Sequence, residues 1–338
     1  MAELEVRLLD LHEFDSWNRF VEFSPQGTLY HTSDWLHAIA SAYVPARPLI
    51  IGCFDNHQLV GGGVFLERER YGILTAVTPL LTPYFGFVLE EPGGEKFSAT
   101  ASKNHAVLSA LGQYLCKHYA YVNLVLAPHL EDIRPLQQLG FTITPRFTYC
   151  LNLRLSPEEH WGRFDGSARR QIKKAQKESF EICSRLPIAP AYRLFESTFR
   201  RRGEDCPVSE SLFSAVLENH GLADRRAIFA AWLGDSLASY IVLLTFNRTL
   251  YYAIAASEAD YLSSGINSLL IWEIIREYAG RDWNIFDFVG ANTPSIARFK
   301  ENFNPRLQLY FQVEYYGLAA LKIGRDIMAL LRGEARPK

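Results

Sequence analysis

The sequence lacks the patterns that mark secreted, membrane-spanning and metal-binding proteins. Its five cysteines have no paired spacing, so we expect reduced thiols rather than disulfides. Its histidines form no HExxH or HxH pattern, so we expect no metal. The longest apolar run, residues 237–246, is far shorter than the roughly 20 residues of a membrane span, and the N-terminus has no apolar core of a signal peptide. We therefore expect a cytoplasmic protein.

The chain also lacks an excess of charge of either sign. Its 35 basic and 37 acidic residues leave a net charge of −2, so no nucleic acid or anionic membrane is required as a partner. Hydrophobic residues make up 48% of the 338 residues, which is typical of a folded chain. At roughly 100–200 residues per domain, this length predicts about two domains.

The two halves of the chain share an order of predicted elements. Each half contains a strand, a polar turn and a second strand, which starts at Leu59 in the first half and at Leu237 in the second. A long helix, a strand, a short helix and a final strand follow in both halves. This shared order indicates duplicated α/β domains, with residues 1–154 as the first and 155–317 as the second. Residues 318–338 are predicted to form a basic helical tail, which either docks on its own domain or contacts a membrane surface.

One acid and one lysine occur in apolar surroundings near the C-terminus. In the predicted strand at residues 284–290, alternation places Asp287 among aliphatic neighbours, where a carboxylate needs a cation or several hydrogen-bond donors. In the helix that follows, Lys300 flanks the apolar stripe, so its ammonium either points along that face into a cleft or reaches out to water. The two residues are either a structural ion pair or parts of an active site.

A predicted helix over residues 156–179 carries five positive charges within nine residues. Because these charges repel one another, either a phosphate-bearing ligand binds there or the face is simply solvated. The four that form one stripe at helical spacing are Arg170, Lys173, Lys174 and Lys177.

Another candidate site is the start of a helix at residues 263–267, with the sequence Ser-Ser-Gly-Ile-Asn. The free N–H groups and partial positive charge of a helix N-terminus suit a pyrophosphate. A capped helix with glycine in its first turn explains the same residues, so both interpretations stay open.

Several stretches resemble the Fem-type branch of the GNAT N-acyltransferase superfamily. They are "YHTSDWLHA", "SARRQIKKAQKESFEI", the helix start "YLSSGINSLL", the strand "FDFVG" and the dipeptide "FK", and they occur in this order over nearly the whole chain. The resemblance implies an α/β fold of two tandem GNAT-like domains, each with a mixed central sheet flanked by helices.

The resemblance also implies an enzyme, an acyltransferase that moves an acyl or aminoacyl group from a thioester or ester to an amine. The acceptor would be a cell-envelope or nucleotide-sugar-linked molecule, such as a precursor of peptidoglycan or of a polysaccharide. Acyl-CoA is the expected donor. The alternative is aminoacyl-tRNA, as in the peptidyltransferases of peptidoglycan interpeptide synthesis, although the charge balance does not favour tRNA. A rival expectation is a non-catalytic binding protein that kept the fold.

Residues at the matching positions take their expected roles from this resemblance. Phe299 and Lys300 fall on the family's Phe-Lys pair, whose lysine is implicated in stabilising the transition state. A fixed cation suits the oxyanion that forms when an amine attacks a carbonyl. The proton that the amine loses would pass to Asp287, Glu258 or Asp260.

The resemblance assigns two further sets of residues. Arg169 and Lys173 match the family pattern for substrate binding best, and Tyr252 is either a general acid at the substrate or a core aromatic. The family's donor loop reads Arg/Gln-x-x-Gly-x-Gly/Ala, and only its first glycine is retained here. The expected donor-binding residues are Ser263, Ser264, Gly265, Ile266 and Asn267.

Overall fold

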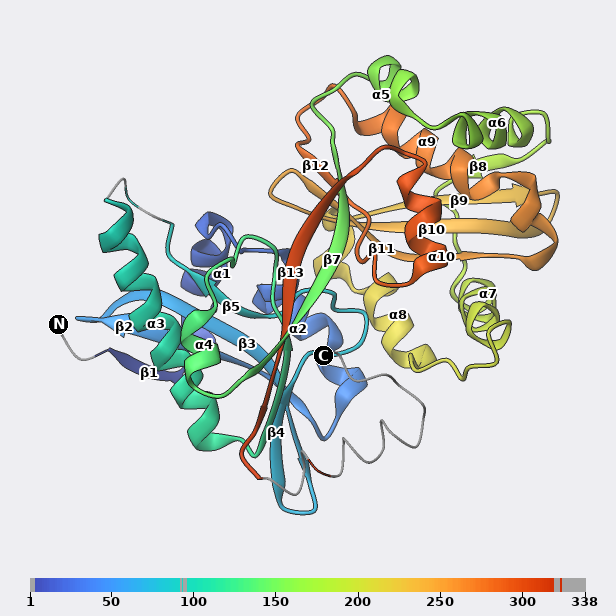
Figure 1. Cartoon of the computed structure of the whole chain (residues 1–338). Coiled ribbons are helices and arrows are strands. Elements are labelled where there is room, and N and C mark those ends of the chain that lie inside the picture. The colour runs from blue at the N-terminus through green and yellow to red at the C-terminus, as the bar shows by residue number, and fades with distance from the viewer. Residues whose placement is uncertain (1–3, 92, 94–95, 319–322, 324–338) are drawn as a thin grey trace. The chain divides into compact units, whose positions relative to one another are not determined.

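The computed structural model describes residues 4–91, 93, 96–318 and 323, so nearly all of the predicted tail, 318–338, lies outside the described residues. The chain divides into two compact units (Figure 1). Unit 1 is Met1–Pro145 with Tyr310–Lys338, and unit 2 is Arg146–Leu309. The predicted boundary lies between residues 154 and 155 instead, and as the limit of a folding domain it stays a prediction.

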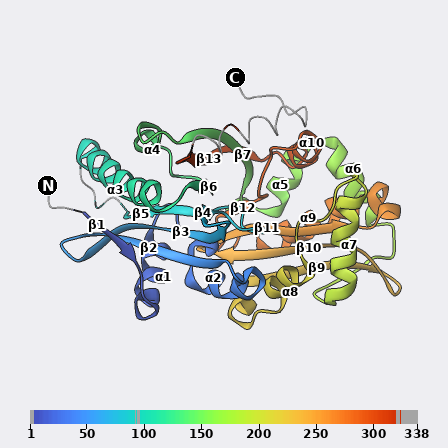
Figure 2. The same cartoon turned by 90° about the horizontal axis from the view of Figure 1, so that it is seen from below.

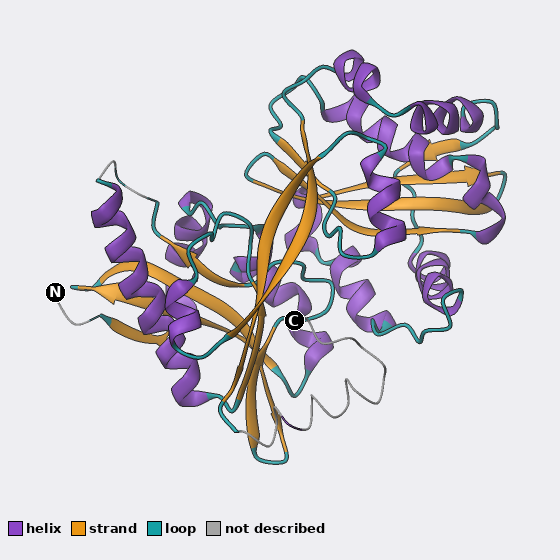
Figure 3. Cartoon of the chain, in the orientation of Figure 1, coloured by secondary structure: helices purple, strands orange, loops and turns teal. Residues whose placement is uncertain are grey.

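Unit 1 is a mixed sheet flanked by helices (Figure 3). Its strands follow the order β1-β2-β3-β4-β6-β13, and β5 also pairs with β3. Neighbouring strands are antiparallel except β4 and β6, which are parallel. The strands are β1 (Glu5–Leu8), β2 (Arg47–Asp55), β3 (Gln58–Arg70), β4 (Ile73–Val77), β5 (Gly86–Leu89), β6 (Tyr121–Val125) and β13 (Arg306–Tyr316), and the helices are α1 (Phe14–Phe23), α2 (Ser33–Ala40), α3 (Phe97–His118) and α4 (Arg134–Gln138).

Unit 2 repeats this plan with the strand order β7-β12-β11-β10-β9-β8. Here β11 and β12 are the parallel pair, and the other neighbours are antiparallel. Its strands are β7 (Thr142–Asn152), β8 (Glu181–Cys183), β9 (Arg226–Leu233), β10 (Ser236–Phe246), β11 (Thr249–Ser257) and β12 (Ile285–Asp287), and its helices are α5 (Pro157–Arg163), α6 (Gly166–Ala175), α7 (Ile188–Arg200), α8 (Glu210–Glu218), α9 (Ile266–Tyr278) and α10 (Pro294–Glu301).

The sheet of each unit includes one strand from the other half of the sequence. β7 follows α4 along the chain, yet its residues 150–152 pair with β12 in unit 2. β13 follows α10, yet its residues 312–316 pair with β6 in unit 1. For this reason the two units divide inside strands β7 and β13.

Helices lie on both faces of the sheet in unit 1 (Figure 2). A Cβ atom at Gly61 of β3 would lie 2.4 Å from Val107 of α3, and one at Gly62 would lie 2.4 Å from Trp17 of α1. Because successive residues of a strand face opposite sides, α3 and α1 press on opposite faces of the same strand. The two glycines make this close approach feasible.

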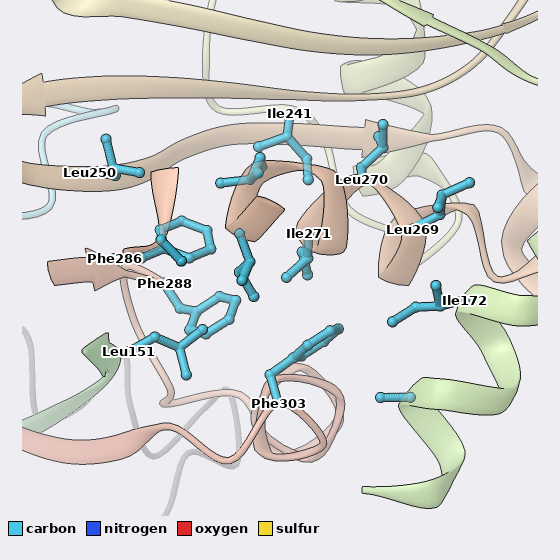
Figure 4. Close-up of a cluster of buried hydrophobic side chains, with 14 of the residues drawn as sticks. Leu151, Ile172, Ile241, Leu250, Leu269, Leu270, Ile271, Phe286, Phe288 and Phe303 are labelled. Atoms are coloured by element: carbon cyan, nitrogen blue, oxygen red, sulfur yellow. The ribbon is translucent and has the colours of Figure 1, made fainter. Parts of the chain in front are cut away.

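The core of unit 2 gathers on one face of its sheet, under α9 and α6 (Figure 4). Ile241 of β10 and Phe286 of β12 pack there with Ile271 of α9. On the other face, the hydroxyl of Tyr240 donates to the carbonyl of Ala191 in α7 at 3.0 Å. The alternation along β10 therefore assigns opposite faces of the sheet to different helices.

The prediction of a single helix over residues 156–179 is wrong. The chain breaks at Phe164 and Asp165 into α5 and α6. Asp165 is the N-cap of α6, because its Oδ1 accepts a hydrogen bond from the Ser167 amide at 2.7 Å. Phe164 is buried in the core at the break. The cap and the buried ring together end one helix and begin the next.

Candidate functional site

The parallel strands β11 and β12 part where the chain makes a sharp turn. Their pairing ends at Tyr251 opposite Asp287, and β11 then continues to Ser257 paired with β10. After Asp287 the chain turns through Val289 and Gly290, whose φ angles of +51° and +86° are left-handed. Beyond Tyr251, no described strand pairs with the edge of β11 that had faced β12. The site is built around this turn.

Asp287 organises the turn from within unit 2. It is buried, and its Oδ1 accepts hydrogen bonds from the Thr148 hydroxyl at 2.6 Å and from the Val289 amide at 2.8 Å. The same Thr148 hydroxyl accepts a hydrogen bond from the Gly290 amide at 3.0 Å. A buried carboxylate needs such donors, and here one comes from the turn itself and one from Thr148 on β7.

Lys300 lies beneath the same turn and is only 5% exposed. Its Nζ donates to the carbonyls of Phe288 at 2.8 Å and Gly290 at 2.6 Å. The carbonyl of Val289 lies at 3.4 Å, beyond the usual N–H···O range, so the third N–H of the ammonium is only weakly engaged. Burial lowers the pKa of Lys300 to about 8, and the nearby Asp287 opposes that effect. The ammonium therefore points inward instead of reaching water.

Two aromatic residues adjoin Lys300. The ring of Tyr252 lies 5.7 Å from Nζ, within the range of a cation–π contact. Burial raises the pKa of the Tyr252 phenol, so the group is neutral at physiological pH, and its hydroxyl has no hydrogen-bond partner among the described residues. Phe299 is half-buried and packs on the core of unit 2. Of the predicted catalytic residues, Asp287 and Lys300 thus meet at the turn, and Phe299 supports the helix beside them.

The predicted donor loop packs tightly against α6. Gly265 has a φ of +88°, and a Cβ there would lie 2.3 Å from the carbonyl oxygen of Gln171. The close approach of α6 thus accounts for this glycine without any ligand. The Ile266 amide donates to the Ser264 hydroxyl at 3.2 Å, so the loop satisfies that donor itself.

The other polar groups of the loop are also engaged inside unit 2. The Oδ1 of Asn267 accepts hydrogen bonds from the hydroxyls of Ser239 and Ser257, which tie α9 to β10 and β11. The carbonyl of Ser263 accepts a hydrogen bond from Lys174 of α6 at 2.8 Å. The loop therefore does not fit the pyrophosphate of CoA in the manner of an open, glycine-lined cradle.

The cationic stripe lies on the outer face of α6. Ile172 and Ala175 face the core, while Arg170, Lys173 and Lys177 are exposed. α6 ends at Ala175, so Lys177 lies just beyond the helix; in the described part of the chain, none of these five cations forms an ion pair. Because α6 packs against the donor loop through Gly265, the stripe lies next to that loop. Gln171 and Lys174 thus hold α6, the helix that carries Arg169 and Lys173, against the predicted donor loop.

Thr148 is a site residue that the sequence did not reveal. It lies on β7, 139 residues from its partner Asp287. Its burial on a strand resembles that of many core threonines, so no local pattern distinguishes it. Only the pairing of β7 with β12 brings the hydroxyl to the carboxylate.

One group of potential metal ligands occurs among the described residues, formed by Asp10, His12 and Glu13. Glu13 is already paired with Arg7 at 2.7 Å, and its carboxylate also accepts from the Asp10 amide at 2.9 Å. The hydrogen bond from Arg7 is the main cause that lowers the pKa of Glu13 to about 2. A helix cap and an ion pair therefore account for this group. Within the described residues, no helix combines the length and apolar character needed to cross a bilayer.

Residues 163–301 match a family model described as an acetyltransferase (GNAT) domain. This stretch runs from the end of α5 to the end of α10, so it contains α6, the donor loop, Asp287 and Lys300. No curated protein matches the sequence.

Solved structures resemble the chain over nearly its whole length. FemX superimposes with a TM-score of 0.62 at 13% identity, covering 91% of this chain and 96% of its own. A tandem GNAT protein from the clavulanic acid pathway gives 0.54 at 11%, covering 94% and 99%. L-PGS from Bacillus licheniformis gives 0.54 at 10%, covering 96% and 97%. At these identities the likeness concerns the fold. The chain has a tandem GNAT-like fold, with a GNAT domain over residues 163–301, and the fold that the sequence resemblance implied is confirmed.

Proposed function

We propose that this protein is an N-acyltransferase. It would transfer an acyl or aminoacyl group from an activated ester or thioester to the amine of a cell-envelope or nucleotide-sugar-linked acceptor. The observation that carries the proposal is the buried ammonium of Lys300 beneath the turn where β11 and β12 part. A buried cation is costly, and this one lies within the stretch that matches the GNAT domain.

Lys300 would stabilise the oxyanion of the reaction. Attack of an amine on the acyl carbonyl places negative charge on the carbonyl oxygen, and the weakly engaged third N–H of Lys300 can donate to it. Asp287 and Thr148 would act as positioning residues, because they hold the turn whose carbonyls orient the ammonium. Tyr252 is neutral and its hydroxyl is unpaired within the described chain, so it would give its proton to the leaving group, and the proton that the attacking amine loses would restore the phenol.

The cations of α6 would bind phosphate groups of a substrate. Arg169 and Lys173 take this role in the proposal, for a nucleotide-linked or lipid-linked acceptor. The second candidate function is aminoacyl-tRNA-dependent peptidyl transfer. It is favoured by the closed donor loop, because phosphates spaced along a nucleic acid would suit an exposed stripe better than a single cradle would.

The test is a transfer assay in which mass spectrometry detects the acylated acceptor. The protein is incubated with UDP-linked muropeptide and either acetyl-CoA or charged aminoacyl-tRNA. An N-acylated product with one donor supports the proposal and identifies the donor class. Thermal unfolding in the presence of each compound tests binding separately from turnover. A ligand at 100 times its dissociation constant adds about 2.7 kcal/mol to the free energy of unfolding. Stabilisation without any product would contradict the proposed acyltransferase activity and favour a non-catalytic binding protein.

A further inference from the structure

A cavity of about 320 Å³ opens in unit 2, and none of the site residues assigned above lines it. It lies between the end of β7, α5 and the segment that joins α10 to β13. The lining combines apolar side chains with amides and two guanidinium groups, and it contains no acidic residue. The residues that matter for the argument are Asn152, Leu155, His160, Arg163, Phe303 and Arg306.

The two arginines of this cavity are exposed. In the described part of the chain, neither Arg163 nor Arg306 forms an ion pair or a hydrogen bond. Many other arginines of the unit have partners: Arg200 pairs with Glu196 and Arg276 with Glu273. Two guanidinium groups beside one cavity, with no carboxylate in its lining, leave uncompensated positive charge there.

His160 gives the cavity a buried polar wall. It is 2% exposed, and its Nε2 lies 3.1 Å from the carbonyl of Asn152. Because a carbonyl only accepts, Nε2 carries the hydrogen, and the neutral ring keeps a lone pair on Nδ1. Burial is the main cause that lowers the pKa of His160; the charge of Arg163 lowers it further, whereas Glu159 and the Asn152 carbonyl act in the opposite direction.

We propose that this cavity binds the oxyanion of a small molecule, either a phosphate or a carboxylate, between Arg163 and Arg306. A guanidinium group is planar and offers paired N–H donors that match such oxyanions. The amide of Asn152 adds a polar contact, and Leu155 with Phe303 provides apolar surface for the rest of the molecule. The volume lies at the small end of ligand sites, so a single sugar or a short chain fits better than a dinucleotide.

The cavity adjoins the Lys300 turn through two of its lining residues. Cys150 lies opposite Asp287 in the pairing of β7 with β12. The ring of Phe303 lies 6.0 Å from that of Phe288, whose carbonyl accepts from Lys300. The inference does not rest on the proposed function, because binding can be measured without any turnover.

Calorimetry with three probes of one carbon skeleton tests the site: glucose 6-phosphate, gluconate and glucose. We expect saturable binding of glucose 6-phosphate, gluconate or both, and none of glucose. Arg163→Gln and Arg306→Gln should each weaken binding about tenfold, and the double variant about a hundredfold. The matched control is Arg193→Gln on α7, an exposed arginine that does not line the cavity, and it should leave binding unchanged.

The ring signals of His160 in a nuclear magnetic resonance titration give a second measurement. A bound anion beside Arg163 should shift these signals and raise the pKa of His160, because it offsets the positive charge. The proposal is overturned if neither charged probe binds saturably, or if the double variant binds as well as the parent. It also fails if Arg193→Gln weakens binding as much as the two lining variants do, since the effect would then be one of net charge.

Discussion

The two units build the same succession of elements and end it with different chemistry. In unit 1 the parallel strands finish at Val77 opposite Asn123, and in unit 2 at Tyr251 opposite Asp287. Asn123 is a neutral amide whose Oδ1 accepts a hydrogen bond from Gln312 at 2.9 Å. The matching position of unit 2 therefore holds a buried carboxylate where unit 1 has an amide.

The helices that follow these strands differ in the same way. α4 of unit 1 has the sequence RPLQQ and carries no lysine, whereas α10 of unit 2 carries the buried Lys300. Burying a carboxylate and an ammonium disfavours folding unless hydrogen bonds compensate, and a neutral amide closes the same position without that cost. Unit 2, which keeps both charges at this position, is thus the candidate for catalysis, whereas the neutral amide of unit 1 indicates a structural role.

Replacing Lys300 would remove the difference between the units most completely. If the ammonium stabilises the oxyanion, Lys300→Met should lower turnover roughly 100- to 1,000-fold. The control is Lys117→Met at the exposed end of α3, which should transfer at the parental rate. Initial rates of product formation would be compared, with circular dichroism to check the fold. If Lys300→Met unfolds the protein, the lysine serves the turn alone and the catalytic assignment fails.

A substitution at Gly62 tests how closely α1 packs on the sheet of unit 1. Gly62→Ala places a Cβ 2.4 Å from the Trp17 ring and 2.5 Å from the Ile51 carbonyl, so we expect unit 1 to lose about 1–3 kcal/mol of its free energy of unfolding. Urea unfolding followed by tryptophan fluorescence measures the loss. Gly162→Ala on α5 is the matched control, because nothing lies within 4 Å of its Cβ position, and it should leave stability equal or slightly higher. An equal loss in both variants would refute the packing argument.

The pH dependence of turnover sharpens the role of the charged pair. Lys300 is protonated below its pKa of about 8, so turnover should fall as pH rises through 8, about tenfold for each further pH unit. Asp287→Asn should move this fall to lower pH, since Asp287 raises the pKa of Lys300. A pH–rate profile of both proteins decides the matter. A flat profile from pH 7 to 9.5 would rule out protonated Lys300 as the catalytic group.

Stability should respond to pH in the opposite direction. The pKa of Lys300 is lowered in the folded state from 10.5 to about 8, so between these values the unfolded chain binds more protons. The free energy of unfolding therefore rises with pH across this window because of this group, and it does not in Lys300→Met. Chemical unfolding of the two proteins at pH 7.5 and 9.5 measures the difference. If the advantage of the parent over Lys300→Met shrank as pH rose, the pKa of Lys300 would not be lowered by burial.

The smallest expected effect concerns Arg169 and Lys173, two cations of α6 in unit 2. Arg169→Gln with Lys173→Gln should weaken the binding of a phosphate-bearing substrate about threefold to tenfold and make that binding less sensitive to salt. Titrations at low and high salt would measure both. Unchanged affinity would remove these residues from substrate binding.

The sequence predicted some of the site because its signals are local. The Phe-Lys dipeptide, the acid in an apolar strand and the cation-rich helix can each be found within about ten residues. Gly265 was found in the same way, but its function in the loop was not, because the carbonyl of Gln171 that needs the space lies on another helix. The split of α5 from α6 was missed since a helical pattern continues across Asp165, while the burial of Phe164 that breaks it is a tertiary fact.

By itself, the sequence determined the α/β class, the duplicated order of elements and the lysine and acid on which the proposed chemistry depends. Only the tertiary structure decided which way Lys300 points and that Thr148 donates to Asp287. It also decided that β7, from the first half of the chain, pairs in unit 2, and that β13, from the second half, pairs in unit 1. The reason is physical: hydrophobic period and capping act between near neighbours, whereas strand pairing joins residues more than a hundred positions apart.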